Sequence, residues 1–482
     1  MKLSVLLRET GLECGFGDTE ISSVTADSRK VIPGSLFVAV EGRKTDGHKY
    51  AAQAISAGAA AVVTCRKTGI EREIITENTE KIYGRLCSSF YGHPEKKLKI
   101  IGITGTNGKT TTAEYLAHVM TYNGAKCGKI GTLGIDTQAE KEESGYTTPE
   151  CDTLFSALDK MARNGCGYCV MEVSSQALAQ ARTDALSFSL GVFTNLGRDH
   201  LDYHGSVGNY VKAKSRLFRS AEISVLNAED PYSSVIAEEA GLGAYFTYSS
   251  GSRMADCMAR KVAFGEKTTD FMFMYGGRAA EIRVDGIMPF TVDNALAAAS
   301  SAIALGTDFY GTAEALCTLP AVNGRCELIS AEDFDVYIDY AHTPEALKIV
   351  TSLLRNRTKG KLICVFGCGG ERDREKRPLM GAVAAEYSQT VIITNDNPRS
   401  EDPEKIISDI KKGIRRKTDV YVIPDRREAI AFAISLASPG DTVLVAGKGH
   451  EAYSLGAYGK KHFNDAETVK ELLGVTKSEM NI

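Results

Sequence analysis

An apolar strand that runs into a glycine-rich loop and then into a helix is the feature that most constrains this sequence. Residues 98–104 (LKIIGIT) form a continuous apolar run, typical of a parallel sheet covered on both faces. The loop 105–111 (GTNGKTT) follows it, and a helical segment follows the loop. Backbone N–H groups of such a loop and the positive end of the helix dipole can bind phosphate oxygens. The arrangement predicts a nucleotide-binding, doubly wound α/β domain.

Two side chains of this loop carry most of its chemistry. Lys109 can reach the β- and γ-phosphates of a nucleotide, and Thr110 can place its hydroxyl on Mg²⁺. The loop departs from the general G-x-x-x-x-G-K-[ST] pattern, because its first glycine lies two residues closer and Ile103 occupies the usual position. The alternative is a glycine-rich turn that only caps a helix. A GKT sequence directly after a strand favours the nucleotide site.

Alternating strands and helices divide the 482 residues into three α/β units. Residues 1–98 have a strand–helix–strand order and predict a small N-terminal domain. Residues 99–325 carry the glycine-rich loop and predict a central ATP-binding domain of the P-loop type. Residues 326–482 add five more predicted strands with helices between them. This last unit is predicted to be a Rossmann-like C-terminal domain.

Composition disfavours two classes of protein. The formal net charge is −4, whereas a general nucleic-acid binder normally has a basic excess. No apolar run approaches the roughly 18 residues that span a bilayer, and the first residues do not form a signal peptide. We therefore expect a cytoplasmic protein, with no membrane insertion and no nucleic-acid partner.

The twelve cysteines raise the alternative of a metal site. Cys166 and Cys169 form a CxxC pair, but no second pair lies at a matching distance. Cys169 also begins the apolar run CVMEV, in which a small buried thiol packs well. Reduced, buried thiols are therefore favoured over a zinc site.

Four loops of the third unit carry ionic or glycine-rich sequences directly after a predicted strand. They are 339–345 (DYAHTPE), 369–374 (GGERDR), 396–399 (DNPR) and 447–451 (GKGHE). The carboxyl ends of parallel strands meet at one edge of a sheet, so these loops are predicted to lie together. One such loop is usually only a turn, but four on one edge favour a functional site.

The central unit offers two further candidate positions. Glu172 ends the apolar run CVMEV, where a carboxylate is costly unless it is paired or binds a metal. The alternative is a salt-bridged strand end. The segment 195–204 (NLGRDHLDYH) follows another predicted strand and is dense in ionisable side chains. Alone, it could be a polar helix start.

Taken together, ten motifs in order resemble the Mur ligase family. They are GTNGKTT, TTPE, MEVSSQAL, TNLGRDHLDYHG, DNALAA, NGR, DYAHTPEAL, GCGGERDREKRP, DNPR and GKGHE, and they span nearly the whole chain. Asp27-Ser28-Arg29 and SLFVAVEG resemble the family's uridine-nucleotide domain. The resemblance implies an ATP- and Mg²⁺-dependent amide ligase of peptidoglycan biosynthesis. Its substrate would be UDP-N-acetylmuramoyl-L-alanyl-D-glutamate, whose γ-carboxylate would be phosphorylated and then attacked by an amine. We expect a monomer.

The resemblance also assigns roles to individual residues. Its catalytic residues are Lys109, Glu172, His200 and Lys214, and its Mg²⁺ ligands are Thr110, Glu172, His200 and Lys214 as a carbamate. ATP contacts fall on Gly105, Thr106, Asn107, Gly108, Lys109, Thr110, Thr111, Asn294, Arg325, Asp339 and His342. The residues expected to bind the UDP-linked substrate are Ser28, Thr147, Thr148, Ser175, Gln180 and Arg182. The residues expected to bind the incoming amino acid are Arg372, Asp396, Asn397, Pro398, Arg399, Gly447 and Glu451.

Lys214 is selected only by the resemblance. The residues alone favour a solvated helix lysine there, with Lys212 two positions away. Two positions also depart from the family pattern. Gln176 stands where some members have His, and Glu150 ends a TTPE sequence that differs after its two threonines.

The sequence DNPR points to meso-diaminopimelate as the incoming amino acid. In the family this motif accompanies diaminopimelate, and members that add lysine lack its arginine. Diaminopimelate has a distal carboxylate that lysine lacks, and a guanidinium such as that of Arg399 can pair with it bidentately. Glu451 can pair with the distal ammonium. The alternatives are a sibling ligase that adds L-lysine, a folylpolyglutamate synthase-like ligase, and a nucleotide-dependent switch without ligase activity.

Overall fold

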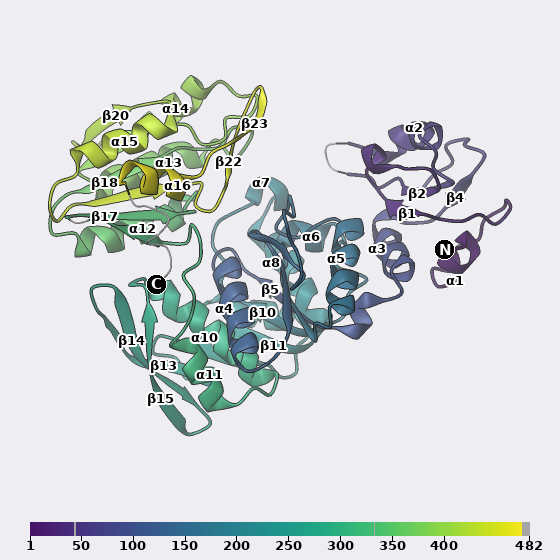
Figure 1. Cartoon of the computed structure of the whole chain (residues 1–482), viewed down its shortest axis with the longest axis horizontal. Coiled ribbons are helices and arrows are strands. Elements are labelled where there is room, and N and C mark those ends of the chain that lie inside the picture. The colour runs from purple at the N-terminus through teal and green to yellow at the C-terminus, as the bar shows by residue number, and fades with distance from the viewer. Residues whose placement is uncertain (43–44, 332, 475–482) are drawn as a thin grey trace.

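Three large sheets with their helices and one two-stranded hairpin build the described part of the protein (Figure 1). The structure is a computed structural model that describes residues 1–42, 45–331 and 333–474. The chain passes from a small N-terminal domain through a large central domain to a C-terminal domain, and the outer two lie on opposite sides of the central one (Figure 1). The predicted three-part α/β architecture is therefore what the chain forms.

The N-terminal domain is a four-stranded parallel sheet in the order β1-β2-β3-β4. Its strands are β1 (Ser23–Thr25), β2 (Ser35–Val38), β3 (Ala61–Thr64) and β4 (Glu73–Ile75). Its helices are α1 (Leu3–Arg8), α2 (Ala51–Ser56) and α3 (Thr79–Phe90), with 3-10 turns η1 (Ser28–Lys30), η2 (Gly47–Tyr50) and η3 (Pro94–Lys97). The Lys30 ammonium lies 3.1 Å from the Asp152 carboxylate of the central domain.

The central domain is built on an 11-stranded sheet whose middle is parallel. The parallel strands are β5 (Lys99–Thr104), β6 (Cys127–Gly131), β9 (Tyr168–Glu172), β10 (Phe188–Phe193), β11 (Ala221–Asn227) and β12 (Phe246–Ser249). Strand β5 is buried on both faces, because Ile100 packs into one core and Ile101 and Ile103 pack into another. Because both faces of the strand are buried, most of its positions are apolar, and this is the run from which the strand was predicted.

Helices cover both faces of the central sheet. The core that contains Ile101 also contains residues of α4 (Lys109–Tyr122), α10 (Pro289–Ala304) and α11 (Phe309–Leu316). The opposite core contains residues of α5 (Cys151–Arg163), α6 (Ser175–Ala179), α8 (Val207–Arg219) and α9 (Tyr232–Ala240), and it continues into the N-terminal domain. The short helix α7 (Leu201–His204) precedes α8.

Further strands with mostly antiparallel pairing extend both edges of this sheet, which the sequence analysis did not predict. On one edge are β7 (Gly134–Asp136) and β8 (Lys141–Glu142). On the other, β13 (Cys257–Phe264), β14 (Thr268–Tyr275) and β15 (Arg278–Asp285) form a meander that projects from the body of the domain (Figure 1). Their burial alternates along each strand, so they lack the continuous apolar runs of the parallel strands.

The C-terminal domain contains a six-stranded sheet in the order β16-β17-β21-β18-β19-β20. The strands are β16 (Glu327–Ser330), β17 (Asp335–Asp339), β18 (Leu362–Phe366), β19 (Thr390–Ile393), β20 (Asp419–Val422) and β21 (Thr442–Ala446). The helices are α12 (Pro344–Arg357), α13 (Lys376–Tyr387), α14 (Pro403–Lys411), α15 (Arg426–Leu436) and α16 (Asp465–Leu472). A hairpin of β22 (Tyr453–Gly456) and β23 (Gly459–His462) follows β21.

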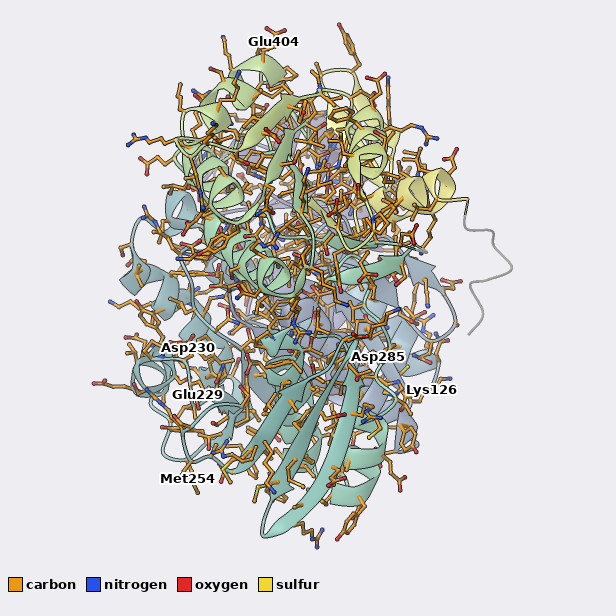
Figure 2. The ribbon with its side chains drawn as sticks, turned by 90° about the vertical axis from the view of Figure 1, so that its left-hand side faces the viewer. Lys126, Glu229, Asp230, Met254, Asp285 and Glu404 are labelled. Atoms are coloured by element: carbon orange, nitrogen blue, oxygen red, sulfur yellow. The ribbon has the colours of Figure 1, made fainter. Side chains whose placement is uncertain are left out.

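The four polar loops of this domain follow β17, β21, β18 and β19, which are parallel neighbours in the sheet. The prediction that they share one edge is therefore confirmed. The central and C-terminal domains lie one above the other in Figure 2, with Glu404 of α14 at one end and Met254, which precedes β13, near the other. No helix in the described ranges is both long enough and apolar enough to cross a membrane.

Candidate active site

A large cleft lies between the central and C-terminal domains. Its volume is about 3090 Å³, several times that of a typical pocket for one small molecule. The glycine-rich loop lines one wall, and the polar loops of the C-terminal sheet line the other. Of the predicted site residues, Ser28 and Pro398 do not line the cleft. Ser28 lies in η1 of the N-terminal domain.

The glycine-rich loop connects β5 to α4, as predicted. Gly105 and Gly108 both have positive φ values, 156° and 85°. A Cβ at Gly105 would lie 1.8 Å from the Thr194 hydroxyl oxygen, so a larger residue does not fit there. The Lys109 ammonium donates to the carbonyls of Gly105 and Thr106, each at 2.9 Å. The loop therefore holds its lysine against its own backbone, at the N-terminus of a helix.

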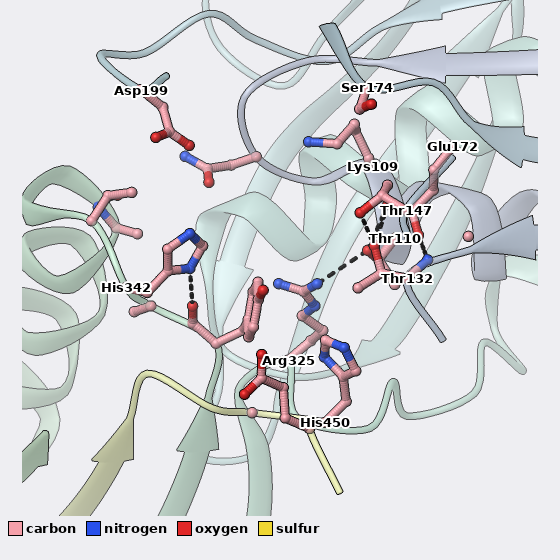
Figure 3. Close-up of a pocket in the computed structure, with 18 of the residues that line it drawn as sticks. Lys109, Thr110, Thr132, Thr147, Glu172, Ser174, Asp199, Arg325, His342 and His450 are labelled. Carbon is pink, nitrogen blue, oxygen red and sulfur yellow. Dashed lines mark hydrogen bonds between the residues drawn. The ribbon is translucent and has the colours of Figure 1, made fainter. Parts of the chain in front are cut away.

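Glu172 lies beside this loop because β9 is the strand next to β5, with Ile103 opposite Glu172. Its carboxylate accepts hydrogen bonds from the Thr110 hydroxyl at 2.9 Å and from the Thr132 backbone N–H at 2.7 Å (Figure 3). The Thr132 hydroxyl also reaches Glu172 at 3.1 Å and the Thr147 hydroxyl at 3.1 Å. The sequence analysis did not identify Thr132, which joins the predicted metal ligands to the predicted substrate contacts.

Lys214 and His200 approach the same region from α8 and from the segment before α7. Lys214 is 1 % exposed, and its ammonium lies 4.5 Å from the centre of the Tyr210 ring. Burial holds the pKa of Lys214 well below its usual value. The His200 ring meets the same tyrosine edge-on, and the Tyr210 hydroxyl lies 3.1 Å from that of Thr106. Tyr210, also missed in the sequence, joins these residues to the phosphate loop.

The link between the two domains enters the cleft through Arg325. Its guanidinium donates to the Thr110 hydroxyl at 3.1 Å (Figure 3). It also lies 4.4 Å from the centre of the Tyr340 ring. Asp339 accepts from the Cys326 N–H at 2.7 Å and from the Ala341 N–H at 2.8 Å. Burial raises the pKa of Asp339. Its carboxylate thus anchors the link close to the phosphate loop.

Threonines and an arginine gather near the exit of β9. The Thr148 hydroxyl donates to the Glu172 carbonyl at 2.9 Å. Arg182 donates to the Thr148 carbonyl at 2.9 Å and pairs with Glu150 at 2.6 Å. The Ser175 hydroxyl lies 2.9 Å from His204 Nε2. The Thr148 contact places this part of the predicted substrate site next to Glu172, one of the predicted metal ligands.

The predicted amino-acid residues gather on the opposite wall. Arg399 Nη1 donates to the Gly370 carbonyl at 2.8 Å, which joins the DNPR loop to the GGERD loop. The Asn397 amide donates to Glu451 at 2.7 Å, which joins the DNPR loop to the GKGHE loop. A Cβ at Gly447 would lie 2.8 Å from an Asp396 oxygen. Three loops that are distant in sequence therefore form one polar surface, with Arg372 also lining the cleft.

All twelve cysteines are free, and Cys166 and Cys169 are buried. Within the described ranges, no group of three or more His, Cys, Asp or Glu side chains is arranged to hold a metal ion. A cation between Thr110 and Glu172 would have a hydroxyl oxygen and a carboxylate oxygen among its ligands, a combination that suits Mg²⁺.

Comparison with protein families accounts for nearly all of this architecture. The Mur ligase family catalytic domain matches residues 20–97, the Mur ligase middle domain matches 103–302, and the Mur ligase glutamate ligase domain matches 324–449. The chain belongs to the Mur ligase family. The family and the three-domain fold expected from the sequence are thereby confirmed.

Individual Mur ligases are similar along the whole chain. The UDP-N-acetylmuramoyl-L-alanyl-D-glutamate–2,6-diaminopimelate ligase of Syntrophomonas wolfei is 40 % identical, over 98 % of this chain and 99 % of its own. A solved structure of a ligase with the same name has a TM-score of 0.67 and 31 % identity, covering 96 % of each chain. The MurF ligase of Thermotoga maritima, solved in complex with ADP, shares the fold, with a TM-score of 0.65 and 20 % identity over 94 % of this chain and 96 % of its own.

Proposed function

We propose that this Mur ligase uses ATP to join meso-diaminopimelate to the D-glutamate γ-carboxylate of UDP-N-acetylmuramoyl-L-alanyl-D-glutamate. Full-length relatives bear the name of that activity. The observation that carries the proposal is the polar wall made by Asn397, Arg399 and Glu451, which faces the phosphate loop across one cleft. The cleft thus combines a site for a nucleotide with a site for a doubly charged amino acid.

The first chemical step would transfer the γ-phosphoryl group of ATP to the substrate carboxylate. A carboxylate oxygen attacks the γ-phosphorus, the bond to the ADP oxygen breaks, and an acyl phosphate forms. Such a transfer depends on positioning and on neutralising charge on the phosphoryl oxygens. Lys109 can do this once it exchanges its loop carbonyls for phosphate oxygens, and Arg325 points into the same space.

The second step would form the amide. The amine nitrogen of the incoming amino acid attacks the acyl carbon, the bond to the phosphate oxygen breaks, and phosphate leaves while the nitrogen loses a proton. The two reacting groups come from opposite walls of the cleft, so holding them in place removes much of the entropic barrier.

Thr110 and Glu172 are the residues that would hold Mg²⁺ beside the phosphates, with His200 as a further ligand. A hydroxyl and a carboxylate are oxygen donors of the kind that Mg²⁺ prefers. When bound, Mg²⁺ supplies positive charge to the phosphate oxygens.

Lys214 is proposed to carry a carbamate. Its side chain is buried and lies against Tyr210, and it makes no hydrogen bond within the part of the chain that the structure describes. A buried lysine without an anionic partner is costly, whereas the same side chain as a carbamate is an anionic oxygen ligand. The burial supports Lys214 over the exposed Lys212.

An amino-acid panel tests the proposed function. Phosphate release is measured with ATP, Mg²⁺ and UDP-N-acetylmuramoyl-L-alanyl-D-glutamate, and with meso-diaminopimelate, L-lysine or L-glutamate as the amine. We expect amino-acid-dependent turnover with diaminopimelate and far less with the other two. Turnover with lysine but not with diaminopimelate would replace the proposed substrate by lysine. ATP binding without amino-acid-dependent turnover with any of them would instead indicate a nucleotide-dependent switch.

A further inference from the structure

A fully buried lysine lies inside the predicted amino-acid site. Lys448 is 0 % exposed and belongs to the GKGHE loop after β21. Lysine is almost never fully buried unless its ammonium is paired. Its partners therefore indicate what the residue does.

Lys448 also lies over the Tyr453 ring, but its two hydrogen-bond partners among the described residues are both predicted amino-acid contacts. The ammonium donates to Asn397 Oδ1 at 3.1 Å and to Glu451 Oε2 at 3.1 Å. Asn397 Nδ2 donates to the same Glu451 oxygen at 2.7 Å. One cation thus links the DNPR loop to the carboxylate that lies three residues after it.

These contacts fix which way the Asn397 amide points. Its oxygen accepts from Lys448 and from the Leu455 N–H at 2.8 Å, so two donors lie on one side of the amide. Only the oxygen can accept them, and the NH₂ group must then face Glu451. Lys448 therefore orients Asn397, and both side chains together orient Glu451.

The arrangement leaves one carboxylate oxygen available in the cleft. Both hydrogen bonds reach Glu451 Oε2, and within the described ranges Oε1 accepts none. The Glu451 side chain is 16 % exposed and lines the cleft, whereas Lys448 is hidden behind it. An oxygen fixed in this way suits a cationic group of a ligand, which a charge-assisted hydrogen bond would hold.

Stability alone accounts poorly for this lysine. A buried ion pair adds little net stability, because the cost of desolvating both charges offsets their attraction. The pair instead lies where the DNPR and GKGHE loops meet beside the cleft.

We propose that Lys448 is a positioning residue that holds Asn397 and Glu451 in place for an ammonium group of the incoming amino acid. The proposal rests on the proposed function. Lys448 itself does not reach the cleft, so its effect passes through the two side chains that do.

The test compares steady-state kinetics of Lys448→Met, Lys448→Arg, Glu451→Gln and the Lys448→Met/Glu451→Gln double variant with the unmodified protein. We expect Lys448→Met to raise KM for diaminopimelate about tenfold or more, with KM for ATP and for the UDP-linked substrate changed less than threefold. Lys448→Arg should recover part of the loss, because it keeps the charge. Lys461→Met, an exposed change on β23, is the matched control and should leave all three constants unchanged.

The double variant keeps the test decisive if Lys448→Met alone does not fold, since it removes both charges of the pair. Its KM for diaminopimelate should stay within threefold of the value for Glu451→Gln. A much larger rise would mean that Lys448 does not act mainly through Glu451, and it would overturn the assignment of Lys448 as the residue that positions this carboxylate. So would an unchanged KM, or an equal rise in all three KM values, in Lys448→Met. Failure of the proposed function would show differently, as absent diaminopimelate-dependent turnover in the unmodified protein.

Discussion

At the scale of single residues, Arg399 is the position on which amino-acid selection depends. Its backbone has a φ of 56°, a conformation that is uncommon for residues other than glycine and is often found at ligand sites. Arg399→Ala should raise KM for diaminopimelate roughly 10- to 100-fold and leave KM for ATP nearly unchanged, because charge-assisted hydrogen bonds contribute about 1.5–3 kcal/mol. The measurement is amino-acid-dependent phosphate release. Arg374→Ala, an exposed arginine on the neighbouring loop, is the control. If both constants stay unchanged in Arg399→Ala, the carboxylate clamp is wrong.

Lys214 allows a second test at this scale. Lys214→Ala should lose most activity, and short carboxylates added to the assay should restore part of it by taking the place of the carbamate. Lys212→Ala removes an exposed lysine from the same helix and should remain active. A Lys214→Ala variant with full activity would rule out the carbamate.

At the scale of elements, a buried ion pair joins α15 to α16. Nε and Nη2 of the Arg426 guanidinium each donate to an Asp465 carboxylate oxygen at 2.7 Å, and the guanidinium also donates to the carbonyls of Asn395 and Ala446. Asp465→Ala should destabilise the C-terminal domain by about 3–5 kcal/mol, because it leaves a buried charge unpaired. Glu471→Ala breaks the exposed Arg427–Glu471 pair between the same helices and should change stability far less, because solvent screens this pair. Chemical unfolding of both variants checks the difference.

A second pair at this scale makes stability depend on pH. Hydrogen bonds from Arg377 lower the pKa of Glu401 to about 2. A carboxyl whose pKa is lowered by folding stabilises the folded state above its unfolded value near 4.5, and the stabilisation is lost as pH falls towards 2. The thermal midpoint of Glu401→Gln should therefore lie below that of the unmodified protein at pH 6, and the gap should close between pH 4.5 and 2. A gap that is constant with pH would contradict this linkage.

Strands that are buried on both faces could be predicted from the sequence, whereas the half-exposed strands of the meander were missed. The apolar runs of β5, β9, β18 and β21 and the proline at the start of α12 identified these elements. The meander β13–β15 has alternating burial and few apolar runs, so a search for apolar runs did not identify its strands. Its pairing depends on contacts between strands that no local pattern specifies.

Some residues of the candidate site could likewise be predicted from the sequence, whereas others could not. Loop chemistry identified Lys109, Glu172 and Arg399, because their residue types are unusual at the ends of strands. Tyr210, Thr132 and Lys448 were missed, since their roles come from burial and from partners 104, 40 and 51 residues away. The sequence alone does not show whether a lysine is buried or solvated, so Lys448 could not be recognised as a buried residue from it.

At the scale of the whole molecule, the cleft is expected to close during turnover. Polar contacts between the two domains, among the residues that the structure describes, include Lys460 to Glu143 at 2.9 Å and Arg357 to the Gly265 carbonyl at 2.7 Å. The first is exposed and therefore weak, so it offers little resistance to movement of the C-terminal domain. A nonhydrolysable ATP analogue together with the UDP-linked substrate should reduce the radius of gyration measured by small-angle scattering. Identical scattering curves with and without these ligands would contradict closure.

The division of the site between two domains also bears on how well ATP consumption is coupled to product. The phosphate loop and Glu172 lie on the central domain, whereas Asn397, Arg399 and Glu451 lie on the C-terminal domain. An activated carboxylate can therefore form on one wall before the amine on the other has arrived, and during that interval water competes for it. The ratio of amide formed to phosphate released measures the fraction of activated carboxylate that reacts with the amine and not with water. Variants that loosen the C-terminal wall should waste ATP before they stop consuming it.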